Sequence, residues 1–218
     1  MRTMVARQKR LNRAALDRAV AALAQRDADL AAIAAEFGPP PLWKRAQGFH
    51  TLIHIILEQQ VSLASARAAF ERLESLVQTV TPENFLALSD AQLRATGFSR
   101  QKSAYGRELA NSIIDGRLNL ESLDALSDHD ARHALTRVRG IGPWTANIYL
   151  LMALGRQDVW PSGDLALEIA MQQIKGLKKR PAPAEASQIS EQWRPWRAVA
   201  ARMLWQFYLQ RPAKRPDD

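Results

Sequence analysis

Residues 135–146 read Leu135-Thr-Arg-Val-Arg-Gly140-Ile-Gly142-Pro-Trp144-Thr-Ala. Two glycines flank one apolar residue, and helical patterns precede and follow them. Glycine permits a positive φ and a close approach by another backbone, and the start of a helix offers N–H donors and a positive dipole end to an anion. The stretch therefore predicts two helices at about 129–154 joined by a phosphate-binding turn, unless it is an ordinary helix–turn–helix connection. The expected phosphate-binding residues are Arg139, Gly140, Ile141, Gly142, Trp144 and Thr145.

The rest of the sequence predicts an all-α chain. Residues 44–58 place apolar side chains at i, i+3, i+4, i+7 and i+8, which is the stripe of a buried helix. Residues 12–36 are rich in Ala, Leu and Arg and predict one long helix that ends at the Gly-Pro cluster of residues 38–41. No alternating strand pattern is present. Further helices are expected at about 62–77, 100–114, 129–138, 144–154, 164–174, 184–193 and 195–209.

Composition narrows the classes of partner. Lys and Arg outnumber Asp and Glu by 30 to 22, a net charge of +8, which suits nucleic acid or an anionic membrane surface. The absence of cysteine excludes disulfides and cysteine-ligated metal clusters within this sequence, and is compatible with a cytoplasmic location. The sequence contains no run of 18 consecutive apolar residues, so it predicts no membrane-spanning helix. The basic ends, residues 1–10 and 211–218, are expected to be disordered arms.

A second informative stretch follows the turn, Val159-Trp-Pro-Ser-Gly163-Asp164-Leu-Ala. With Gly-Pro-Trp144-Thr-Ala-Asn147 and Trp193-Arg-Pro-Trp196-Arg197, it resembles the helix-hairpin-helix (HhH-GPD) DNA glycosylase superfamily, in its 3-methyladenine DNA glycosylase II branch. The resemblance implies two helical subdomains with a DNA-binding cleft between them. One comprises residues 48–155, and the other residues 1–47 with 156–218. We expect none of the N-terminal β-rich domain that larger relatives carry.

By this resemblance Asp164 matches the essential aspartate of the family. Cleavage of an N-glycosidic bond builds positive charge on the sugar, and a nearby carboxylate stabilises that charge and can orient water. The alternative is that Asp164 only caps a helix.

Relatives that also nick the DNA backbone carry a Schiff-base lysine where this sequence has Trp144. The resemblance therefore implies a monofunctional glycosylase without AP-lyase activity.

Tryptophans are expected to line the base pocket. Alkylated purines are cationic, and indole faces attract cations and stack on flat rings. The resemblance assigns this role to Trp144 and Trp196, and we extend it to Trp43 and Trp160, with core packing as the alternative for each. The branch has an aromatic residue where this chain has Ile148, so the pocket is expected to differ in shape.

The segment Phe49–Ser62 contains Glu58-Gln-Gln-Val-Ser62, which also resembles this branch. By match, Gln60 is the wedge that fills the gap left by a flipped base, and Gln59 lies beside the gap or pocket. The alternative is that Gln59 and Gln60 only form a polar helix end.

His50 and His54 are one helical turn apart, but no third metal ligand is apparent. Arg100, Lys102 and the run Lys178–Arg180 are either phosphate contacts or solvated charges.

The sequence thus predicts a base excision repair glycosylase that hydrolyses alkylated purines, of the 3-methyladenine and 7-methylguanine type, from double-stranded DNA. We expect a monomer that binds no membrane and needs no organic cofactor; the resemblance allows a structural Na⁺ or K⁺ at the hairpin carbonyls. Three alternatives stay open: a glycosylase for uracil or hypoxanthine, a non-catalytic hairpin module that binds damaged DNA, and a basic helical protein that binds RNA or membranes.

Overall fold

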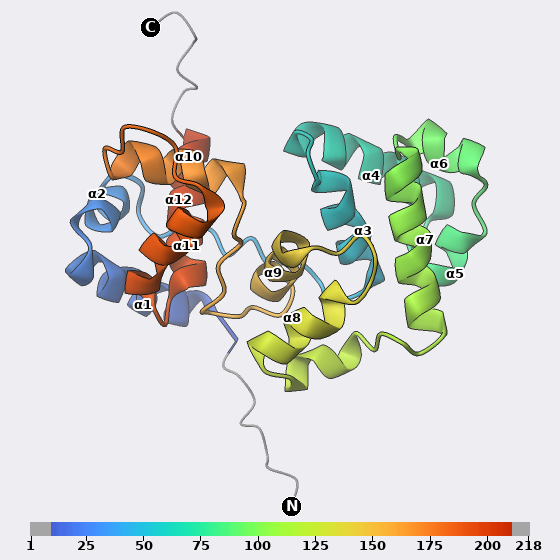
Figure 1. The fold of residues 1–218 in the computed structure, drawn as a ribbon, viewed down its shortest axis with the longest axis horizontal. Coiled ribbons are helices and arrows are strands. Elements are labelled where there is room, and N and C mark those ends of the chain that lie inside the picture. The colour runs from blue at the N-terminus through green and yellow to red at the C-terminus, as the bar shows by residue number, and fades with distance from the viewer. Residues whose placement is uncertain (1–9, 211–218) are drawn as a thin grey trace, which may run out of the picture. The chain divides into compact units, whose positions relative to one another are not determined.

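The computed structural model describes residues 10–210, and every regular element in that range is a helix (Figure 1). This confirms the all-α prediction. Contacts divide the described chain into one unit of residues 44–154 and a second unit of residues 10–43 with 155–210. The domain boundaries expected after residues 47 and 155 stay predictions. The two basic arms lie outside the described residues, apart from Arg10.

The first unit is built around α3. This helix packs against α4, α7 and α9 (Figure 1). The apolar side chains of its stripe are buried; they are Phe49, Leu52, Ile53, Ile56 and Leu57. The helix begins at Phe49 and not at residue 44, because Gly48 adopts a φ of 133° and its N–H donates to the Tyr149 hydroxyl, 3.0 Å away. The helices of this unit are α3 (Phe49–Glu58), α4 (Leu63–Val77), α5 (Pro82–Leu86), α6 (Asp90–Thr96), α7 (Arg100–Ile114), the 3-10 helix η1 (Glu121–Ala125), α8 (Asp128–Thr136) and α9 (Pro143–Met152).

The second unit is built around α12. This helix packs against α1, α2 and α10, and residues 198–207 on it are buried on all sides. Among the residues described, no helix is long and apolar enough to cross a membrane. The helices of this unit are α1 (Arg13–Arg26), α2 (Ala28–Phe37), α10 (Leu165–Ile174), α11 (Pro183–Ser190), the 3-10 helix η2 (Glu191–Trp193) and α12 (Arg197–Gln210).

The single helix predicted over residues 12–36 is wrong, because Asp27 interrupts it. Asp27 is extended, and its side chain accepts hydrogen bonds from the backbone N–H groups of Asp29 and Leu30 at the start of α2. Its other oxygen accepts from Lys175 Nζ and Trp193 Nε1, each at 2.8 Å. Capping and a buried charge-assisted network therefore outweigh the helical propensity of the surrounding sequence.

The C-terminal helices also differ in detail from the expectation. The helix predicted over 184–193 ends at Ser190 and continues as η2, and α12 begins at Arg197, two residues after the predicted start. Asp158 accepts hydrogen bonds from the backbone N–H and the guanidinium of Arg197. This contact gives the first N–H of α12 a partner outside the helix.

Candidate functional site

The turn between α8 and α9 needs glycine at position 140. Gly140 has a φ of 97°, and a Cβ added there would collide with the Tyr105 ring of α7. The next residue, Ile141, is 3% exposed, and its N–H donates to the Val138 carbonyl oxygen at 3.0 Å. Left-handed backbone and close packing together exclude a side chain at position 140, while Ile141 anchors the turn in the core.

The first turn of α9 has the features of an anion site. Gly142 is the N-cap and Pro143 the first helical residue, and among residues 10–210 no side chain caps this helix start. The space next to Gly142 is open to 4 Å. Helix N-terminal N–H groups of this kind bind phosphate oxygens. The phosphate-binding roles predicted for residues 139–145 stay predictions.

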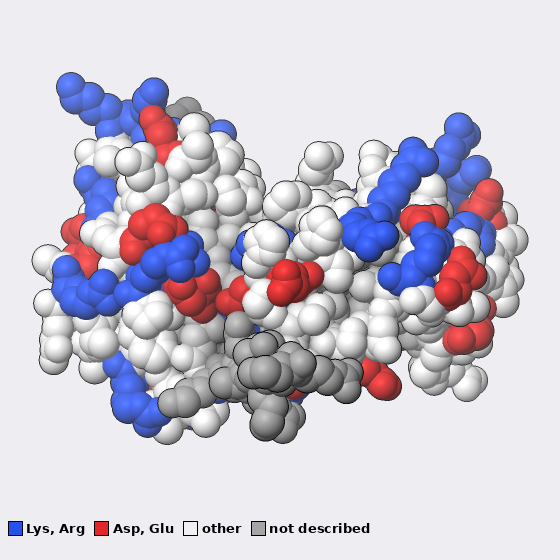
Figure 2. Space-filling view, turned by 60° about the horizontal axis from the view of Figure 1, so that its bottom comes forward, with Lys and Arg blue, Asp and Glu red and all other residues white. Residues whose placement is uncertain are grey.

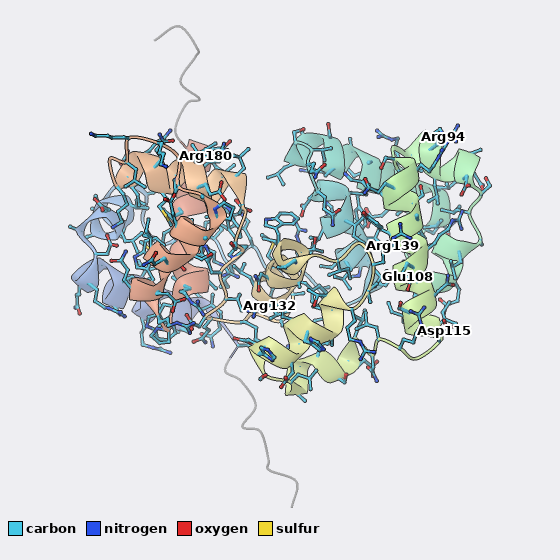
Figure 3. The ribbon with its side chains drawn as sticks, in the orientation of Figure 1. Arg94, Glu108, Asp115, Arg132, Arg139 and Arg180 are labelled. Carbon is cyan, nitrogen blue, oxygen red and sulfur yellow. The ribbon has the colours of Figure 1, made fainter. Side chains whose placement is uncertain are left out.

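Arg139 is exposed beside this turn, near Glu108 of α7 (Figure 3). The pKa of Glu108 lies below its ordinary value, first because Arg117 donates a hydrogen bond to it, with a smaller contribution from the positive charge of Arg139. Arg132, on α8, donates to Asn147 Oδ1 at 2.8 Å and so ties α8 to α9 (Figure 3). The hairpin is thus a braced element, and Arg137 and Arg139 are both exposed in the segment between its two helices.

The turn after α3 contacts the hairpin. Gln59 Nε2 donates to the Gly140 carbonyl oxygen and to Thr145 Oγ1, both at 2.9 Å. The adjacent Gln60 is exposed and has a φ of 57°. From α7, Lys102 Nζ donates to the Leu57 carbonyl oxygen at 2.7 Å. The sequence left two alternatives for Lys102, a phosphate contact or a solvated charge. The structure shows a third arrangement, in which Lys102 binds a backbone carbonyl within its own unit.

Asp164 lies in the second unit, at the N-cap of α10. It is 9% exposed, and its Oδ1 accepts hydrogen bonds from the Leu167 N–H and from Trp205 Nε1, each at 3.1 Å. The capping function considered from the sequence is therefore present. Capping uses one oxygen and does not conflict with a catalytic function, which stays a prediction.

Trp205 contacts Asp164 and was not predicted from the sequence as a site residue. It lies on α12, 41 residues from Asp164 in sequence. The Trp43 ring packs edge-on against the Trp205 ring, with centroids 6.3 Å apart. Trp43 has a φ of 42°, and Arg202 holds the preceding Leu42 carbonyl oxygen at 3.0 Å. No local pattern could have indicated Trp205, because it lies within the long apolar surface of α12.

The remaining predicted tryptophans lie in different surroundings. Trp160 is 6% exposed and packs on Trp193, with ring centroids 5.6 Å apart. Trp196 is half-buried, and its backbone N–H donates to the Trp193 carbonyl oxygen at 2.7 Å. Trp144 is half-buried on α9 in the first unit. The structure therefore brings Trp43 into the surroundings of Asp164, through Trp205, and packs Trp160 within the second unit; the pocket roles stay predictions.

A second buried carboxylate, Glu168, lies one turn after Asp164 on α10. It is 6% exposed, Arg180 Nε lies 3.5 Å from its Oε2 (Figure 3), and its Oε1 has no hydrogen-bond partner among the described residues. Burial raises the pKa of Glu168; the positive charge of Arg180 opposes this shift, and the negative charge of Asp164 adds to it. Glu168 was not predicted as a site residue, because no local sequence pattern indicates that it is buried.

On the face shown in Figure 2, Asp and Glu lie beside Lys and Arg on both units. Ion pairs among the described residues include Arg67 with Glu71 and Arg197 with Asp158. Within residues 10–210, His, Asp and Glu side chains form no group of three or more that could hold a metal ion. Binding of a polyanion therefore depends on the basic groups that are not engaged in such pairs.

The hairpin and the Asp164 loop both fall within one family match. The family model for HhH-GPD superfamily base excision DNA repair proteins matches residues 53–195. The chain belongs to this superfamily. As in the resemblance seen from the sequence, the matched region includes the glycine turn, Trp144 and Asp164.

Several relatives of this HhH-GPD protein are named as DNA-3-methyladenine glycosylases. It is 29% identical to the putative DNA-3-methyladenine glycosylase YfjP of Bacillus subtilis, over 81% of this chain and 64% of that protein. It is also 29% identical to DNA-3-methyladenine glycosylase 1 of Schizosaccharomyces pombe, over 81% of this chain and 79% of that protein. The structure of the S. pombe glycosylase Mag1 with abasic DNA aligns with a TM-score of 0.79 and 27% identity, covering 87% of this chain and 95% of that one.

Proposed function

We propose that this protein is a monofunctional DNA glycosylase of base excision repair that hydrolyses the N-glycosidic bond of alkylated purines in double-stranded DNA. The observation that carries the proposal is the carboxylate of Asp164. It is buried, it is held by Trp205 and Leu167 at the start of α10, and it lies inside the family match. The names of the S. pombe and B. subtilis relatives support the alkylated-base substrate.

Asp164 is the proposed catalytic residue. As the bond from the sugar C1′ to the base nitrogen breaks, its electron pair leaves with the base and positive charge develops on the sugar. The Asp164 carboxylate stabilises that charge. A water oxygen then forms the new bond to C1′, and the water gives up a proton to the carboxylate or to solvent. The alkylated base leaves neutral because it was cationic in the DNA, so little acid catalysis is needed.

The remaining predicted residues have roles in binding. The first turn of α9, with Arg139, binds DNA phosphates, and Na⁺ or K⁺ at the hairpin carbonyls would be structural. Gln60 fills the gap left by the flipped base. Trp144, Trp43 and Trp196 supply aromatic faces for a cationic purine, with Gln59 and Trp160 as further predicted pocket residues. Trp144 carries no amine, so it forms no Schiff base, and the proposed enzyme leaves the abasic strand intact.

Base release from methylated duplex DNA, measured by mass spectrometry, tests this proposal. Wild type is expected to free 3-methyladenine or 7-methylguanine and to leave strands uncut until alkali is added. Asp164→Asn, which keeps the shape of the side chain, is expected to bind the DNA and free no base. Release of uracil or hypoxanthine alone would replace the substrate assignment, and binding without release of any base would favour the non-catalytic module.

A further inference from the structure

The turn between α3 and α4 exposes an unusual set of side chains. Gln60, which is not glycine, has a φ of 57°, and the turn leaves Val61 46% and Leu63 60% exposed. A left-handed backbone at such a residue persists only where the surroundings hold it. Two contacts, both within the unit of residues 44–154, hold the backbone on the N-terminal side of Gln60.

The first contact is made by Gln59. A side-chain amide nitrogen has two hydrogens, and Gln59 directs them to the Gly140 carbonyl oxygen and to Thr145 Oγ1. Gly140 lies in the hairpin turn, and Thr145, 1% exposed, lies in the first turn of α9. Gln59 therefore fixes the turn after α3 to both sides of the proposed phosphate-binding element.

The second contact is made by Lys102. Its ammonium lies 2.7 Å from the Leu57 carbonyl oxygen, in the last turn of α3. Carbonyl groups at a helix C-terminus lack intrahelical partners, and a positive charge is favourable there. Lys102 is half-buried, and burial lowers its pKa. A half-buried amine that binds backbone is poorly placed to reach DNA phosphate, in contrast to the exposed Arg100 two residues earlier.

We propose that Lys102 and Gln59 are positioning residues for base flipping: they hold the turn after α3 so that Gln60 is presented in its strained conformation at a fixed place relative to the hairpin. The inference rests on the proposed glycosylase function and deepens it. Because the turn is already ordered, no binding free energy is lost in ordering it when DNA binds. Lys102 acts through the Leu57 carbonyl and contributes no charge to the DNA contact.

The test is Lys102→Met in the full chain, with Lys102→Arg as the conservative variant and Lys44→Met, an exposed lysine of the same unit, as the matched control. Three quantities are measured. They are the salt dependence of affinity for undamaged duplex, the fluorescence change of 2-aminopurine beside a lesion as it unstacks, and the single-turnover rate of 7-methylguanine release.

For Lys102→Met we expect unstacking and base release to slow on the order of tenfold, with the affinity for undamaged DNA and its salt dependence unchanged. Lys102→Arg should recover most of the loss, and Lys44→Met should match wild type. A fall of about one in the slope of log affinity against log salt would instead identify Lys102 as a phosphate contact and overturn the inference. So would unchanged unstacking.

If thermal unfolding shows that Lys102→Met does not fold, Gln59→Leu replaces it in the same three measurements. This variant removes the contact between the turn and the hairpin without removing a charge. The wild-type measurement separates the two levels of the argument. Wild type that frees no alkylated base defeats the proposed function and this inference with it. Active wild type with normal unstacking in the variants defeats only the positioning role.

Discussion

Replacing Trp205 by phenylalanine removes the indole N–H that donates to Asp164 while keeping an aromatic ring at the position. Of the two hydrogen bonds that Trp205 and Leu167 donate to Asp164 Oδ1, only the one from the Leu167 N–H, at 3.1 Å, then remains. We expect the carboxylate to lose its fixed orientation about the end of α10. Under the proposed function that orientation places the carboxylate for reaction, so we expect the loss mainly in the rate of base release.

The size of the effect follows from the type of hydrogen bond. A hydrogen bond to a charged group contributes about 1.5–3 kcal/mol. If this is fully expressed in the transition state, the rate falls between about 10-fold and about 150-fold, at roughly 1.4 kcal/mol for each factor of ten. We therefore expect Trp205→Phe to retain activity well above that of Asp164→Asn.

The same unit contains a matched control, Trp193→Phe. Trp193 Nε1 donates to Asp27, the N-cap of α2, at 2.8 Å, just as Trp205 donates to the N-cap of α10. Both substitutions remove an indole N–H from a buried helix-capping aspartate. Each should lower the free energy of unfolding by about 1–3 kcal/mol, whereas only Trp205→Phe should slow the reaction.

The assay is single-turnover release of 7-methylguanine, with enzyme in excess over methylated duplex, and urea unfolding of each variant. The reasoning is refuted if Trp205→Phe stays within about threefold of wild type while Asp164→Asn is inactive. An equal loss of rate in Trp193→Phe would also refute it, because the effect would then come from general destabilisation of the unit.

Three further outcomes are expected. Burial raises the pKa of Glu168, so its ionisation opposes folding as the pH rises above the ordinary range of a glutamate. Relative to wild type, Glu168→Gln should therefore be more stable in urea unfolding at pH 8 than at pH 5, and a difference independent of pH would contradict this. Gly140→Ala should lower the free energy of unfolding by at least about 2 kcal/mol, because the added Cβ would meet the Tyr105 ring and the residue has a positive φ. The Cβ of Gly142→Ala would meet open space, so this variant should lose less than about 1 kcal/mol. Equal losses in the two variants would count against the close packing at position 140. Arg139→Ala should reduce the salt slope of DNA affinity by about 0.9 without changing which base is released, and an unchanged slope in a titration against salt would exclude a phosphate contact.

Local chemistry made the hairpin and its surroundings predictable. The glycine at position 140, the buried Ile141 and the helix that starts at Pro143 are each determined by neighbouring residues. The apolar stripe of α3 predicted a buried helix in the same way, although its start was wrong because Gly48 binds Tyr149, which lies 101 residues away. Predictions from sequence pattern hold where the determining contacts lie within a few residues.

The supporting contacts of the site were not predictable for the opposite reason. Asp27 ends α1 because Lys175 and Trp193, 148 and 166 residues later, surround its carboxylate. Lys102 looked like a surface charge in sequence and instead binds a backbone carbonyl 45 residues earlier. Whether a charged side chain meets solvent or a buried acceptor depends on which helices pack together.

The sequence by itself predicted helices, a glycine turn that precedes one of them, and Asp164 at the start of another, and the structure of residues 10–210 has all three. The turn and Asp164 lie in the region that matches the HhH-GPD family. Only the tertiary structure decided that Trp205 holds Asp164 and that Trp43 packs on Trp205. Helical periodicity records which face of each helix is apolar, but several helices can cover that face. The partner is selected by side-chain packing across the core, which no local pattern encodes.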